Sequence, residues 1–128
     1  METFTKVTLY TDKDGYARFR EKQIAFVDGP PGLRLTGEFP CKSCQLRHSP
    51  VGFSLDFHVC GDKPLWVAVL QGILEITLQD GTSRQFMPGD CFYAADVLPA
   101  GATFDPEVHG HRSRQVGDAP LVTLFANE

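Results

Sequence analysis

Three observations predict an all-β fold, a sandwich or barrel of short strands. Twelve glycines and nine prolines divide the 128 residues into short apolar stretches. The best helical candidate, Ala17–Phe26, shows no sustained stripe of apolar residues at the 3.6-residue period of a helix. Asp80-Gly81 lies between two apolar runs and is a strong hairpin signal, because this dipeptide tolerates the positive φ angles of a tight turn. Many short strands separated by turns are typical of sandwiches and barrels.

The expected strands are apolar runs bounded by turn residues. They are Phe4–Tyr10, Tyr16–Val27 (with a break allowed), Phe53–Cys60, Leu65–Leu70, Ile73–Leu78, Thr82–Met87, Cys91–Ala95, His111–Val116 and Pro120–Ala126. Further turns are expected at Pro88-Gly89-Asp90 and at Gly117-Asp118. Asp28–Pro50 holds four prolines, three glycines and two cysteines without a clear period, and predicts a long loop across one mouth of the barrel. Loops of that length usually serve a site.

Length and charge limit the classes of function. A chain of 128 residues fits one domain, 1–128, with a core of its own. The net charge is −4, and no run of Lys and Arg lacks interleaved acids, so we expect no nucleic-acid partner. The longest uncharged apolar stretch, Pro64–Ile73, is too short for a membrane span. METFTKVTLYTDKDG has no apolar signal core, so we expect a cytoplasmic protein whose four cysteines are thiols or ligands and not a disulfide framework.

One spacing carries a family resemblance. The chain reads Gly52-x5-His58-x-Cys60-x4-Leu65-x6-Gly72. This resembles the first motif of cupins, G-x5-H-x-H-x(3–4)-E-x6-G, with Cys in place of the second His and Leu in place of Glu. The following VLQGILEITLQDGTSRQFMPGD is similar to the centre of many small cupins. The resemblance covers about residues 52–125 and implies a single-domain jelly-roll barrel.

The second cupin motif, G-x5-P-x-G-x2-H-x3-N, fits the chain in two registers. One places it on Pro99, Gly101, Phe104 and Val108, which loses the His and the Asn. The other places it on Pro106, Val108, His111 and Gln115, which keeps the Pro and the His. We prefer the second register, because His111 opens a plausible strand that Gly117 ends.

The resemblance implies a metal site in the barrel that has been partly lost here. His-x-His on a strand aims two imidazoles into one lumen, since side chains alternate between the faces of a strand. His58 and His111 remain at matching positions, Cys60 is a soft third candidate, and Leu65 cannot coordinate. Alternation adds His109 to the face of His111. The candidate metal ligands are therefore His58, Cys60, His109 and His111, for zinc, iron or nickel. The alternative is a metal-free lumen that binds organic molecules by shape.

Alternation also selects catalytic candidates. Asp56 shares the predicted inward face of His58, so we expect Asp56, His58 and His111 to act as acid–base groups, with the two imidazoles in one lumen. His titrates near neutral pH, which suits this role. The alternative orientation, with the polar faces outward, stays open because periodicity alone does not exclude it.

For substrate contacts we single out the aromatic residues Trp66, Phe57 and Phe104 and the cation Arg112. Aromatic side chains on strands also serve as core or interface residues, and Arg112 with Arg114 is also typical of a solvated strand face. Phe53, Phe92 and Tyr93 are further candidates for an aromatic pocket.

Cys41-x2-Cys44-x3-His48 resembles half of a zinc ribbon or a redox pair. A ribbon needs a second pair of ligands, and none is close in sequence. A redox pair of the thioredoxin kind needs a βαβ context that is missing here. Two ordinary loop cysteines are the default interpretation.

Three functions remain open at this point. The first is an enzyme of the isomerase, cyclase, dehydratase or lyase type acting on a small organic molecule, with His58 and His111 as its working groups. The second is a metal-free small-molecule binding or sensor module, and the third is a structural dimer. Small cupins usually pair through their sheets, and the apolar runs Phe4–Tyr10 and Tyr16–Val27 are expected to support a homodimer.

Overall fold

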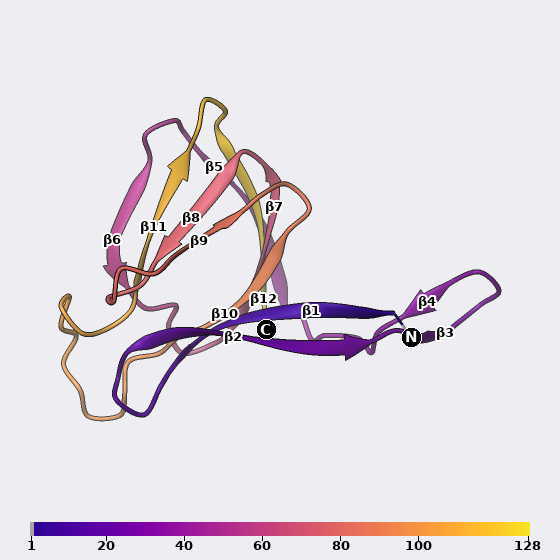
Figure 1. The fold of residues 1–128 in the computed structure, drawn as a ribbon, viewed down its shortest axis with the longest axis horizontal. Coiled ribbons are helices and arrows are strands. Elements are labelled where there is room, and N and C mark those ends of the chain that lie inside the picture. Colours follow the sequence, from indigo (N-terminus) through magenta and orange to yellow (C-terminus); the bar gives the residue numbers. More distant parts are fainter. Residues whose placement is uncertain (1) are drawn as a thin grey trace.

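The computed structural model describes residues 2–128, and the regular elements in this range are all strands (Figure 1). The strands are β1 (Thr3–Thr11), β2 (Ala17–Ala25), β3 (Val27–Asp28), β4 (Arg34–Leu35), β5 (Ser43–Ser49), β6 (Ser54–His58), β7 (Leu65–Gln71), β8 (Ile73–Thr77), β9 (Ser83–Phe86), β10 (Cys91–Ala95), β11 (His111–Val116) and β12 (Leu121–Asn127). Across the part of the chain described, no helix is long and apolar enough to cross a membrane.

Two sheets form the barrel. The larger has six strands in the order β2-β1-β10-β7-β12-β5, and the smaller has four in the order β6-β11-β8-β9. β1 and β10 are parallel, whereas the other neighbours in both sheets are antiparallel. Two facing sheets joined by crossovers of this kind are a jelly roll, the architecture of cupins. The predicted all-β, cupin-type jelly-roll fold is thereby confirmed.

All nine predicted strands are present, with ends that differ by at most two residues from the expectation. The run predicted over 16–27 is broken at Phe26 into β2 and β3. At the predicted hairpin, the amide of Thr82 donates to Asp80 Oδ1 at 2.8 Å, and Gly81 has φ +87°. At the next turn, the amide of Met87 donates to Asp90 Oδ2 at 2.8 Å.

The prediction of a long loop over Asp28–Pro50 is wrong in part. Its second half is β5, which pairs with β12 along its whole length, from Ser49 opposite Leu121 to Ser43 opposite Asn127. Its first half contributes β4, which forms a small hairpin with β3 at the far end of the β1–β2 ribbon (Figure 1). β5 reads SCQLRHS and is almost wholly exposed. An edge strand of polar residues has no apolar alternation to reveal it, because it buries so little.

The core lies between the two sheets and takes residues from both. It is built from Val7, Leu9, Ala17, Val67, Val69, Leu74, Ile76, Leu78, Phe86, Phe92, Ala94 and Leu121. The rings of Phe86 and Phe92 stack with centroids 4.5 Å apart. Part of this core also lines a cavity that stays open between the sheets.

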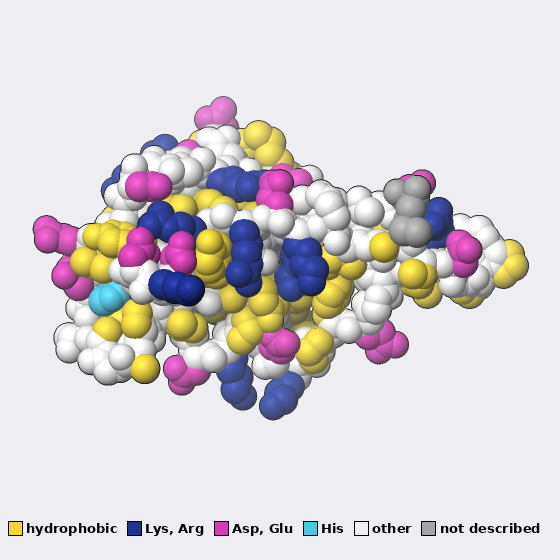
Figure 2. Space-filling view, turned by 60° about the horizontal axis from the view of Figure 1, so that its bottom comes forward, with side chains coloured by type: hydrophobic (Ala, Val, Ile, Leu, Met, Phe, Trp, Pro, Cys, Tyr) yellow, Lys and Arg dark blue, Asp and Glu magenta, His cyan; other side chains and the backbone are white. Residues whose placement is uncertain are grey.

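Strand pairing gathers basic side chains on one face of the β1–β2 ribbon. Pairing places Lys6 beside Lys22, and Arg20 beside Thr8, on one face. Figure 2 shows Lys and Arg side chains interspersed with apolar ones in the middle of the molecule. The middle of β2 is exposed and polar, so only β1 has the apolar character on which the expected homodimer was based. The homodimer stays a prediction.

Candidate functional site

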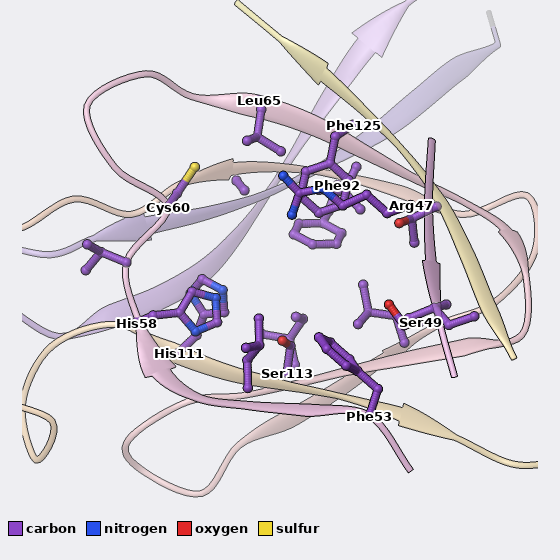
Figure 3. Close-up of a pocket in the computed structure, with 18 residues that line it drawn as sticks. Arg47, Ser49, Phe53, His58, Cys60, Leu65, Phe92, His111, Ser113 and Phe125 are labelled. Atoms are coloured by element: carbon purple, nitrogen blue, oxygen red, sulfur yellow. The ribbon is translucent and has the colours of Figure 1, made fainter. Parts of the chain in front are cut away.

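The open part of the lumen is a cavity of about 250 Å³ between the two sheets (Figure 3). Most of its lining is apolar and comes from both sheets. The polar lining residues are Arg47, Ser49, His58, Cys60, His111, Ser113 and Thr123, and the aromatic ones are Phe53, Phe92 and Phe125. Concave, mainly apolar cavities with a few converging polar groups are the usual form of small-molecule sites.

Two imidazoles lie together on one wall of this cavity. His58 ends β6 and pairs directly with His111, the first residue of β11. Their ring centroids are 4.5 Å apart, and both residues line the cavity. The structure therefore places the two histidines in one lumen, as expected from the motif and from the preferred register of its second half.

A glycine permits this close pairing. Gly110, which precedes His111, has φ +80°, a conformation that side chains with a Cβ rarely adopt. A Cβ added there would collide with the carbonyl oxygen and carbon of His58. The backbone of Gly110 therefore lies against the backbone of His58, and the two imidazoles are held side by side.

A bulge in β6 decides which side chains face inward. His111 pairs with His58 and Ser113 with Leu55, so Asp56 and Phe57 together oppose the single residue Arg112. One extra residue reverses the alternation beyond the bulge. Leu55 therefore lines the cavity with His58, although strict alternation would put them on opposite faces.

For this reason Asp56 does not share the inward face of His58, contrary to the expectation on which its catalytic candidacy was based. Its side chain lies on the exposed outer surface of the small sheet, beside Arg112 and Arg114, and not in the cavity. What Asp56 contributes is its carbonyl oxygen, which accepts a hydrogen bond from His58 Nδ1 at 2.7 Å. A carbonyl only accepts, so Nδ1 of His58 carries the proton and Nε2 is left as an acceptor.

The acid at the site is Asp96, which directly follows β10. It is fully buried, and its Oδ2 lies 2.6 Å from His111 Nδ1. Its Oδ1 accepts from the amide of Cys60 at 3.2 Å. A buried carboxylate must be paired, and these contacts pair it. Asp96 was not among the candidates predicted from the sequence, because those acids were sought on strands. The only signal for it was a lone carboxylate directly after a predicted buried strand.

The environment of His58 favours its neutral form. Desolvation by burial is the largest cause that lowers the pKa of His58, and the neighbouring His111 lowers it further. The hydrogen bond to the Asp56 carbonyl acts in the opposite direction but does not prevail. His58 is thus an uncharged imidazole at neutral pH, with Nε2 available to accept a proton.

The predicted metal ligands are not brought together. Among residues 2–128, no group of three or more His, Cys, Asp or Glu side chains is arranged to hold a metal ion. His109 lies outside the cavity, where its Nδ1 accepts from the amide of Asp105 at 2.9 Å, because the turn at Gly110 ends the alternation that would have aligned it with His111.

The remaining donors also fit a metal poorly. Burial raises the pKa of the Cys60 thiol to about 11, which disfavours the thiolate that metals require. Leu65 occupies the position of the motif's Glu and lines the cavity. Two imidazoles alone do not complete a protein metal site.

None of the four predicted substrate contacts lines the cavity. Trp66 lies on the opposite face of the large sheet, with its ring centroid 5.0 Å from Phe39 and 5.3 Å from Tyr93. Alternation explains this, since its neighbours Leu65 and Val67 point inward. Arg112 lies outside the small sheet with its guanidinium 5.6 Å from the ring of Phe57.

Phe104, the fourth, is exposed next to His109. The aromatic lining comes instead from Phe53 and Phe92, which the sequence had indicated, and from Phe125, which it had not. The missed cation is Arg47, which lies in the segment predicted to be a loop.

Cys41, Cys44 and His48 form no metal site. Cys41 and Cys44 are exposed free thiols. Cys44 and His48 share one face of β5, while Arg47 and Ser49 on the other face line the cavity.

Comparison with known proteins finds likeness only among solved structures. No protein-family description matches the chain, and no curated protein matches it. A cupin protein from Bacteroides fragilis is 22% identical with a TM-score of 0.45, over 66% of this chain and 62% of that one. The Cnp3 cupin domain of Schizosaccharomyces pombe is 14% identical with a TM-score of 0.46, over 100% and 86%.

A candidate ethanolamine utilization protein Q from Salmonella typhimurium is also 14% identical, with a TM-score of 0.41 over 99% of this chain and 97% of that one. At such identities a likeness bears on the fold alone, and the cupin-type barrel rests on the strand order described above.

Proposed function

We propose that this cupin-fold protein is an enzyme that moves protons on a small organic molecule held in the barrel lumen. The observation that carries the proposal is the pair of imidazoles, 4.5 Å apart, at the wall of the cavity and anchored through their Nδ1 atoms. Isomerases, cyclases, dehydratases and lyases all need a base and an acid within reach of one substrate.

Each imidazole has a distinct support. His58 is neutral and offers Nε2 as the base, since its pKa is lowered and its Nδ1 is bonded to a carbonyl. Asp96 fixes the orientation of His111 and is placed to stabilise the imidazolium through which a proton-transferring His111 passes. Two adjacent imidazolium ions would repel each other, so the pair favours one acid and one base at a time.

Hydrogen exchange tests this proposal even while the substrate is unidentified. Small ketones, hydroxy acids and unsaturated acids are incubated with the protein in D2O, and deuterium uptake at carbon is followed by NMR. We expect protein-dependent uptake for part of the panel, lowered about 100-fold or more in His58→Ala and in His111→Ala. His48→Ala is the matched control, because His48 lies on the face of β5 opposite the cavity-lining Arg47 and Ser49.

Two results would contradict the enzyme. Deuterium uptake that is unchanged in both His58→Ala and His111→Ala would show that the two histidines do not transfer the protons. Tight binding of a compound with no exchange and no turnover would favour the alternative, a non-catalytic binding or sensor module. Elemental analysis of untagged wild-type protein and of His58→Ala is run in parallel, since metal lost with the mutation would instead support coordination.

A further inference from the structure

Arg47 is a cation at the wall opposite the two histidines. It projects from β5 into the cavity, across from His58 and His111 (Figure 3). Its guanidinium carbon lies 4.0 Å from the ring centroid of Phe125, and its Nε donates to Gln45 Oε1 at 3.0 Å. Stacking on Phe125 and one hydrogen bond hold the side chain in place, while the terminal nitrogens remain available as donors.

Arg47 is not neutralised by an acid of the described chain. Among residues 2–128 it forms no ion pair, whereas Arg18, Arg84 and Arg114 each lie within 3.0 Å of a carboxylate oxygen. No Asp or Glu is among the lining residues of the cavity. Asp96 lies behind His111 and is engaged by its Nδ1. The lining thus presents one permanent positive charge without a counter-ion.

The rest of the lining indicates what would accompany an anionic group. Phe53, Phe92 and Phe125 surround the cavity together with aliphatic side chains, and its volume of about 250 Å³ is small for a ligand site. An apolar body of modest size fits such a space. A planar, two-oxygen anion fits the fork of an arginine best.

We propose that the cavity binds a small organic monocarboxylate. Arg47 binds the carboxylate, the phenylalanines enclose an apolar body, and the far end of the molecule lies against His58 and His111. This ligand class builds on the proposed function, since it names the kind of substrate that would reach the two histidines. It can be tested by binding alone.

The binding experiment compares acids with their neutral amides by calorimetry. Acetate, hexanoate, phenylacetate and 3-phenylpropionate are each paired with the corresponding amide, and inorganic phosphate is included as a purely ionic probe. We expect the aromatic acids to bind about tenfold more tightly than their amides, because a charge-assisted pair of hydrogen bonds is worth about that factor. Phosphate, which lacks the apolar body, should bind more weakly than phenylacetate.

Variants assign the preference to one residue. In Arg47→Gln the tenfold preference for the acid should fall to about one, with binding of the amide little changed. Arg47→Lys keeps the charge without the planar fork and should retain an intermediate preference. Arg112→Gln is the matched control, because Arg112 is exposed, without an ion pair among the described residues, and outside the cavity. Circular dichroism confirms that each variant is folded.

The outcomes separate the ligand class from the chemistry. A preference that survives in His58→Ala and is lost in Arg47→Gln supports the monocarboxylate site even if no proton exchange is found. The ligand class is overturned if no acid binds, if amides bind as tightly as acids, if the preference persists in Arg47→Gln, or if phosphate matches phenylacetate.

Discussion

The two walls of the cavity are built differently. On the wall of the small sheet, His111 begins β11, a strand that pairs with a neighbour on each side. His111 is only 6% exposed, and its side chain is hydrogen-bonded to the fully buried Asp96. On the opposite wall, Arg47 extends from β5, an exposed strand at the edge of the large sheet. Groups that transfer protons need a fixed geometry. A cationic side chain that only has to bind an anionic ligand, such as Arg47, can extend from a more exposed strand, because its long aliphatic stem reaches the cavity. Changes to the first wall should affect chemistry and stability, and changes to the second should affect ligand preference.

The largest expected effect is that of replacing Asp96 on the rate of proton exchange. In Asp96→Asn the hydrogen bond to His111 can persist in altered form, but the negative charge that stabilises an imidazolium is lost. We expect proton exchange on the responsive compounds to fall about 100-fold. Asp56→Asn provides the matched comparison, since its carboxylate lies outside the cavity and its substitution should leave exchange unchanged. The reverse ranking of these two variants would contradict the assignment.

The next largest effect is expected from replacing Gly110, which should lower the stability of the fold. Ala at this position combines a positive φ with a collision against the His58 backbone. We expect Gly110→Ala to lower the free energy of unfolding by about 2 kcal/mol or more, measured by urea denaturation. Gly101→Ala is the control, because Gly101 has a similar φ of +77° but open space around it. Equal losses in both variants would show that the close approach to His58 is unimportant.

The smallest expected effect is a pH dependence from His58. Its pKa is lowered in the folded protein, mainly by burial, so the unfolded chain takes up this proton first as the pH falls. The associated stability is therefore fully present above the ordinary His pKa of about 6.5 and is lost as the pH falls towards the lower folded value. Thermal unfolding between pH 8 and pH 5 should show a shallower decline in His58→Gln than in the wild type. Identical slopes would count against a desolvated His58.

Much of the fold was predictable because it depends on local chemistry. Asp80-Gly81 forms the turn of the predicted hairpin, and the predicted apolar runs are strands separated by turns. The spacing from Gly52 to Gly72 indicated the barrel and located His58, and the preferred second register located His111. The exposed edge strand β5 escaped prediction because its polar residues bury too little to leave a pattern.

The sequence by itself determined the all-β barrel, and its motif spacing indicated His58 and His111 as candidates for the lumen, while the inward orientation of both imidazoles came from the structure. Only the tertiary structure decided the rest of the site. The bulge that turns Asp56 outward depends on how β6 pairs with β11, and Asp96 reaches His111 from a segment 15 residues away in the chain. Arg47 joins the cavity only because β5 pairs with β12. Strand periodicity assigns faces within one strand, but register, bulges and contacts between distant segments are settled when the sheets assemble.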